Sequence, residues 1–75
     1  MVLPLDQLCT GVWGCVTGID TTAQLRQRLR DFGLVPGTRV RRRYASPAGD
    51  VIAIELRGSV IALRKQDLQW IRVRV

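Results

Sequence analysis

The fold is decided by the stretch Arg28-Leu29-Arg30-Asp31-Phe32-Gly33-Leu34-Val35-Pro36-Gly37-Thr38, where a helix ends and the chain turns into a strand. Gly33 stands where helices commonly end in a left-handed residue. Pro36 cannot continue a helix because it has no backbone N–H to donate, and the pair Pro36-Gly37 marks a turn. The stretch therefore predicts a helix on its N-terminal side and a strand that begins at Thr38.

The helix before this turn is predicted over Ala23–Phe32. Asp20-Thr21-Thr22 precedes it, and each of these side chains carries an oxygen that can accept from the free N–H groups of the first helical turn. Leu25, Leu29 and Phe32 follow at i, i+4 and i+7, which places them on one helical face. We therefore expect these three side chains to pack into the core.

The rest of the chain reads as short strands joined by turns. Leu3–Leu8 is predicted to be a lead-in that packs its leucines on the core, and Arg64–Leu68 a single helical turn. The strands are predicted over Val12–Ile19, Thr38–Ala45, Val51–Leu56, Val60–Leu63 and Trp70–Val75. A closed sheet leaves no exposed edges, so we predict one mainly β domain over residues 1–75. Its architecture is expected to be a small five-stranded β-barrel with one α-helix after the first strand.

Composition excludes most kinds of catalytic site. The chain of 75 residues has no His, which removes the Ser-His and Cys-His nucleophile pairs and every metal site that contains His. It has six acidic residues and no glycine-rich motif for nucleotide phosphates. We therefore predict a protein that binds other molecules and is not an enzyme.

The two cysteines, Cys9 and Cys15, are weak candidates for metal ligands. They do not form a C-x-x-C pair, and neither a His nor a nearby pair of acids completes a tetrahedral set. Small buried hydrophobic side chains are the simpler interpretation. We expect no resident cofactor, and the alternative left open is a weak or dimer-bridging transition metal.

The first residues of the chain and its apolar stretches indicate where in the cell the protein is found. The first residues lack the basic and long apolar regions of a signal peptide. The apolar stretches elsewhere are too short to cross a bilayer. We therefore expect an intracellular protein without membrane insertion.

Three segments, in order, resemble the FeoA family of small ferrous iron transport proteins. Arg28–Thr38 is similar to its R-L-x-x-x-G-[LI]-x-P-G-[ST] signature, and Ser46–Asp50 resembles its A-P-x-G-D-P loop. Gly58–Arg64, followed by Ile71 and Val73, resembles its R-G-x-x-[IL]-[AS]-L-R … I-x-V end. The resemblance covers nearly the whole chain. At two positions the chain departs from this pattern: it has Val51 where Pro is common, and Arg42 where an apolar residue is usual.

The resemblance implies an SH3-like barrel and a cytoplasmic accessory role in bacterial ferrous iron uptake. The implied partner is FeoB, a membrane transporter for ferrous iron that carries a GTPase domain. A peripheral position at the inner face of the cell membrane would follow. The same fold also occurs as a C-terminal domain of iron-dependent repressors, and because no winged-helix region precedes it here, we favour the standalone protein.

Residues for partner contact are expected on turns and on basic positions beside them. Leu34 and Val35 are expected at the tip of the helix-to-strand turn, where an apolar tip beside cations suits a protein partner. Asp50 either caps its own turn or contacts a partner. The full candidate set is Leu34, Val35, Arg43, Pro47, Gly49, Asp50, Arg57 and Arg64.

The formal charge of +6 keeps a second class of partner open. The run Arg39–Arg43 suits a nucleic-acid-binding SH3-like barrel. Such barrels usually display aromatic side chains among the cations, and this chain has only four aromatics. A third alternative, capture of a Pro-rich peptide, needs an exposed aromatic groove built from Tyr44, Trp13 or Trp70. The oligomeric state stays open.

Overall fold

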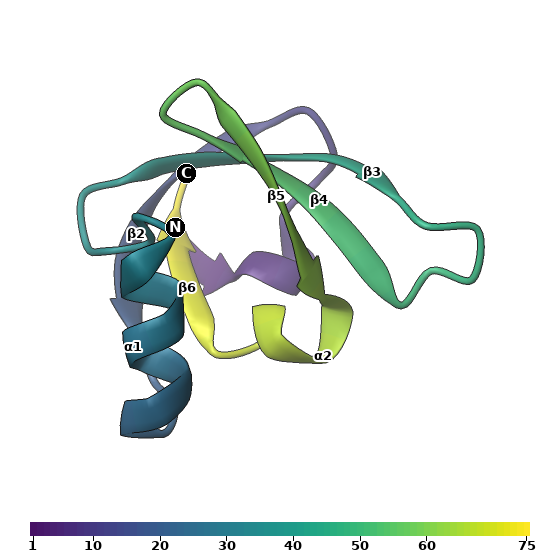
Figure 1. The fold of residues 1–75 in the computed structure, drawn as a ribbon. Coiled ribbons are helices and arrows are strands. Elements are labelled where there is room, and N and C mark those ends of the chain that lie inside the picture. The colour runs from purple at the N-terminus through teal and green to yellow at the C-terminus, as the bar shows by residue number, and fades with distance from the viewer.

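The computed structural model describes all 75 residues and shows six strands, two short helices and one 3-10 turn (Figure 1). The strands are β1 (Val2–Pro4), β2 (Trp13–Ile19), β3 (Arg39–Ala45), β4 (Val51–Leu56), β5 (Ser59–Arg64) and β6 (Ile71–Arg74). The helices are α1 (Ala23–Asp31) and α2 (Lys65–Leu68), and the 3-10 turn is η1 (Leu5–Gln7). The element types and their order follow the sequence prediction, apart from the first strand.

All six strands join one antiparallel sheet in the order β1-β6-β2-β3-β4-β5. The two termini lie side by side because β1 pairs antiparallel with β6 (Figure 1), and the amino group of Met1 donates to the Val75 carbonyl at 3.2 Å. The helix α2 contacts both β5 and η1, so it connects the two ends of the sheet. The mainly β, SH3-like barrel is confirmed.

The strand count differs from the prediction because β1 was expected as an irregular lead-in. Val2–Pro4 pairs with β6, with Val2 opposite Arg74 and Pro4 opposite Arg72. Three residues are too short to show an alternating pattern, and Pro4 tolerates this place because the strand lies at the sheet edge. The barrel therefore has six strands instead of five, and α1 follows the second strand instead of the first.

The core is a single cluster of apolar side chains. They come from every strand except β1, from α1 and α2, from η1 and the residue after it, and from the turn that follows α1. Leu5 and Leu8 lie fully inside it, as expected of the lead-in. The cluster consists of Leu5, Leu8, Val16, Leu29, Leu34, Val40, Ile52, Ile54, Leu56, Leu63, Leu68, Ile71 and Val73. Partly buried Leu3, Ile19, Leu25 and Ile61 pack against it.

The predicted start of the helix is confirmed in atomic detail. The hydroxyl of Thr22 accepts from the backbone N–H of Leu25 at 3.2 Å, which is the N-cap geometry. On the predicted apolar face, Leu29 is buried and Leu25 is half-buried. The expectation for Phe32 is wrong, because 47% of this residue is exposed.

The turn after α1 explains both the exposed Phe32 and a second correction. Gly33 has a φ of 94°, a left-handed conformation that favours glycine, and the N–H of Leu34 donates to the Leu29 carbonyl at 2.9 Å. This reversal carries the side chain of Leu34 into the core, where it is 0% exposed, while Phe32 stays outside. The expected exposure of Leu34 is therefore wrong.

The glycines of β2 lie at a bulge and at a close approach between two strands. The pairing of β2 with β6 shifts register between Val16 and Gly18, which is a bulge. At Gly14, a Cβ would lie 3.2 Å from the Cβ of Val73. Glycine at that position therefore allows β2 and β6 to pack closely.

Candidate functional site

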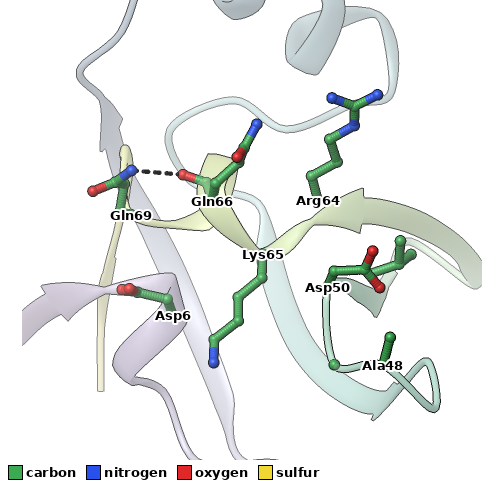
Figure 2. A pocket seen from close by; sticks show the side chains of 9 residues that line it. Asp6, Ala48, Asp50, Arg64, Lys65, Gln66 and Gln69 are labelled. Carbon is green, nitrogen blue, oxygen red and sulfur yellow. Dashed lines mark hydrogen bonds between the residues drawn. The ribbon is translucent and has the colours of Figure 1, made fainter.

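A groove of about 800 Å³ opens between η1, the β3–β4 loop and α2 (Figure 2). It brings together three segments that are far apart in the sequence. Most of its lining is polar or charged, and only two of the residues are hydrophobic. The lining consists of Asp6, Ala48, Gly49, Asp50, Val51, Arg64, Lys65, Gln66 and Gln69.

The β3–β4 loop is held by hydrogen bonds around Ser46 and Asp50. The Ser46 hydroxyl donates to the Asp50 carboxylate at 2.9 Å, and the N–H of Gly49 donates to the Ser46 carbonyl at 2.8 Å. Asp50 therefore caps its own turn. The N–H of Val51 donates to the Ser46 hydroxyl at 3.2 Å, a bond that the usual Pro could not make. The loop is thus tied down at the position where the chain departs from the family pattern.

The same loop is connected to α2 through its backbone. The N–H of Lys65 donates to the Asp50 carbonyl at 2.9 Å, which fixes the start of α2 against the loop. In Figure 2, the side chain of Lys65 extends between Asp6 and Ala48, while Arg64 points away on the other side of the ribbon. Lys65 therefore places its ammonium group in the groove, and Arg64 lines the rim while its guanidinium points away.

The charges around the groove are not neutralised within the chain. The salt bridges of the structure are confined to Glu55 with Arg41 and Arg43, so neither Arg64 nor Lys65 has a carboxylate partner. One carboxylate oxygen of Asp6, Oδ1, is buried and accepts no hydrogen bond. The groove thus offers unpaired cations to a molecule that enters it, whereas the buried Asp6 Oδ1 is out of reach of such a molecule.

The residues predicted for partner contact do not form one surface. Gly49, Asp50 and Arg64 line the groove, and Pro47 lies beside it on the same loop. The remaining four lie elsewhere. Leu34 is buried, and half-buried Val35 lines a hollow with Arg26 and Arg30 of α1. Arg57 donates to the Thr38 hydroxyl, and Arg43 pairs with Glu55 on the sheet. Their roles in partner contact stay predictions, except that Leu34 has no exposed surface to offer.

The candidate set predicted from the sequence lacks four polar or charged groove residues, Asp6, Lys65, Gln66 and Gln69. Asp6 reaches the groove only because η1 packs against α2, and no local sequence pattern predicts that contact. Gln66 and Gln69 belong to a motif-free helical turn, in which the Gln69 amide donates to the Gln66 carbonyl at 2.8 Å (Figure 2). Tertiary proximity is the only signal that would have found them.

The exposed aromatic residues lie apart from one another. Tyr44 lines a separate apolar groove of about 440 Å³ with Pro47, Val60 and Ile61 among its neighbours. The Trp13 ring lies under the guanidinium groups of Arg39 and Arg41, on the outside of the sheet. Neither Trp13 nor Trp70 lines the groove at Tyr44.

Comparison with known proteins matches residues 3–75 to the family described as FeoA domain. The chain belongs to the FeoA family. A FeoA-like protein from Clostridium acetobutylicum is 32% identical, with a TM-score of 0.87 over 99% of this chain and 86% of that one. A structure of an iron uptake regulatory protein (FeoA) is also 32% identical, with a TM-score of 0.87 over 99% and 97% of the two chains.

A more distant likeness concerns the fold alone. A manganese-dependent transcriptional repressor is 19% identical, with a TM-score of 0.86 over 97% of this chain and 41% of the repressor chain. A search of curated protein sequences gives no significant match. FeoA proteins are small accessory proteins and not a known enzyme family, and membership implies a role in iron uptake.

The cysteines of this FeoA chain differ in exposure. Cys15 is half-buried on β2, whereas Cys9 is exposed, so the expectation that both are buried hydrophobes is wrong for Cys9. Both are free thiols. No three Cys, Asp or Glu side chains gather into a group that could hold a metal ion. None of the helices has the length and apolar character needed to cross a membrane.

Two arginines of β3 hold one carboxylate on β4. Arg41 Nε and Arg43 Nη1 each donate to Glu55 Oε1 at 3.0 Å, and Arg41 also donates through Nη2. The hydrogen bond from Arg41 is the main reason why the pKa of Glu55 lies below its ordinary value of 4.5, and Arg43 adds to this effect. Desolvation of the carboxylate acts in the opposite direction and is outweighed.

The lowered pKa of Glu55 predicts a pH-dependent contribution to stability. Because the folded state holds the ionised carboxylate more tightly, this contribution is complete above the ordinary value of 4.5 and is lost as the pH falls through the lowered pKa. We expect Glu55→Gln to be less stable than the natural chain at neutral pH and equally stable in acid. Urea unfolding of both chains from pH 7 to pH 2 measures this, and a pH-independent difference would contradict it.

Proposed function

We propose that the chain is a non-enzymatic accessory protein of ferrous iron uptake that binds the GTPase domain of a FeoB-type transporter on the cytoplasmic side. Membership of the FeoA family is the observation that carries this proposal. The polar groove adds support, because it presents charged groups that the chain itself leaves unpaired. Iron is the cargo of the transporter in this proposal, and the chain needs no metal of its own.

The mechanism we propose is docking that favours one state of the transporter. A bound protein shifts a conformational equilibrium only by the difference between its affinities for the two states. The chain therefore has to bind one nucleotide state of the GTPase domain more tightly than the other. Regulation of iron uptake would follow from that difference, without a catalytic group supplied by this chain.

The groove between η1, the β3–β4 loop and α2 is the docking site that we assign to this contact. Hydrogen bonds of Ser46 and Asp50 hold its loop in place, so the loop loses little conformational entropy on binding. Arg64 and Lys65 give it two unpaired cations at its edge. Their preferred contacts are carboxylates of the partner, which raise the association rate and fix orientation.

Binding to the isolated GTPase domain, in its GDP-bound and GTP-bound states, tests the proposal. We expect the double variant Arg64→Glu and Lys65→Glu to weaken binding by about tenfold or more, since a removed and reversed charge pair costs over 1.4 kcal/mol. The matched control is Arg28→Glu with Arg30→Glu, which makes the same change of charge on exposed residues of α1.

Two results would refute parts of this proposal. If the GTPase domain binds in no nucleotide state, the docking function fails. If binding occurs but both double variants weaken it equally, the groove is not the contact and only net charge matters. Equal affinity for both nucleotide states would remove the regulatory mechanism.

A further inference from the structure

The outer face of the sheet collects arginines on the far side from the core. Along a strand, side chains point alternately inward and outward. In β6, Ile71 and Val73 are buried, and Arg72 and Arg74 between and beside them are exposed. In β3, Val40 is buried and Arg39 is exposed. The alternation therefore turns Arg39, Arg72 and Arg74 toward solvent.

The pairing of the strands arranges these side chains in two rows. The first row crosses β1, β6, β2 and β3 and consists of Val2, Arg74, Cys15 and Arg39. The second row crosses β2, β3, β4 and β5 and consists of Trp13, Arg41, Glu55 and Val60. We name this surface the arginine face and define it as Trp13, Arg39, Arg41, Arg43, Glu55, Arg72 and Arg74.

The arginine face is strongly positive. It holds five arginines and a single carboxylate, Glu55, which is already bonded to Arg41 and Arg43. Arg39, Arg72 and Arg74 are exposed and have no carboxylate partner. Adjacent strands lie about 4.8 Å apart, so the first row spans roughly 14 Å. A positive area of this width needs an extended anionic counterpart.

Trp13 gives the arginine face an amphipathic centre. Its ring lies 5.1 Å from the Arg39 guanidinium carbon and 4.7 Å from that of Arg41, both within the range of cation–π attraction. The residue is nevertheless 36% exposed, and Val2 on the first row is 51% exposed. A Trp with basic neighbours is the combination that settles at the headgroup level of a bilayer.

We propose that the arginine face binds the anionic headgroups of a lipid bilayer. Arginines near an anionic membrane surface each strengthen attachment, and the exposed Trp13 and Val2 can enter the interfacial region. A single-stranded nucleic acid fits this face less well, since stacking of bases needs a free aromatic ring and the ring of Trp13 already carries two guanidinium groups. The binding requires no transporter and is therefore independent of the docking groove.

Vesicle binding of the full chain tests this proposal. The probes are vesicles of phosphatidylcholine alone and vesicles that contain one third phosphatidylglycerol. We expect co-sedimentation with the anionic vesicles only, weakened by salt because exposed charges are screened. In a Trp70→Phe background, Trp13 is the sole tryptophan, and we expect its emission to shift to the blue on binding.

The deciding comparison uses two variants with the same loss of charge. Arg39→Gln with Arg74→Gln should weaken binding to anionic vesicles by about 10- to 30-fold, whereas Arg28→Gln with Arg30→Gln on α1 should change it by less than about threefold. All four positions are exposed, so both variants are expected to keep their circular dichroism spectra. Equal losses in the two variants, no sedimentation with anionic vesicles, or tighter binding to an oligonucleotide through the same arginines would overturn the proposal.

Discussion

Leu34→Ala is expected to lower the free energy of unfolding by about 2–5 kcal/mol, the usual range for a buried leucine. Leu34 is 0% exposed and belongs to the central core cluster, although it lies in a turn. The backbone of the turn resists collapse around the cavity, because Gly33 is fixed in its left-handed conformation and the N–H of Leu34 is bonded to Leu29. A domain of this length has a total stability of roughly 4–11 kcal/mol, so the variant should be close to unfolding.

The matched control is the neighbouring residue, since Val35 is only half-buried. We expect Val35→Ala to cost about 1 kcal/mol or less. Urea unfolding with a common m-value compares the two. Equal losses would contradict the burial of Leu34. A partner-binding defect in Leu34→Ala that persists in fully folded protein would contradict the conclusion that this side chain has no docking role.

Local patterns were sufficient to predict most elements of this barrel. The Thr22 cap and the Gly33 turn each act within a few residues, and each appears in the structure as predicted. Phe32 and Leu34 were assigned the wrong way round. The helical period does not show where the helix ends. Because α1 ends at Asp31, the chain reverses after Phe32, so Phe32 stays exposed and Leu34 takes the buried position.

The candidate site was less predictable because it depends on distant segments. Asp50 and Arg64 could be selected from turn and charge patterns, but the groove also needs Asp6, which η1 brings from the other end of the chain. The arginine face has the same origin. Arg39 and Arg74 are separated by 35 positions and come together only through their shared neighbour Cys15 on β2. No single segment of the sequence contains that register.

Arg42→Ala is expected to destabilise the chain by about 2–3 kcal/mol, a typical cost for losing hydrogen bonds from a charged donor to buried acceptors. At this position, where the family usually has an apolar residue, the Arg42 side chain turns inward. Its Nη1 donates to the carbonyls of Asp6 at 3.1 Å and of Leu8 at 3.0 Å. A bulge between Arg42 and Tyr44 accompanies this placement. The guanidinium therefore ties β3 to η1.

Arg43→Ala is the control, because Arg43 is exposed and ion pairs of exposed side chains contribute little to stability. Hydrogen exchange localises the effect. In Arg42→Ala, the amide of Leu8, which donates to Leu5 within η1, should exchange faster. The amide of Gly11 should be less affected, since it donates to the Arg42 backbone carbonyl, which alanine retains. Equal stability of the two variants would show that the inward bonds of Arg42 contribute nothing.

The same variant connects the fold to the docking groove. Asp6 lines the groove and belongs to η1, so loosening η1 displaces one wall while leaving Arg64 at the end of β5 and Lys65 at the start of α2 in place. We therefore expect Arg42→Ala to weaken binding of the GTPase domain more than Arg43→Ala does, even at temperatures where both variants are fully folded. Unchanged binding in Arg42→Ala would mean that the wall formed by η1 takes no part in the contact, and the groove would then have to act through α2 and the β3–β4 loop alone.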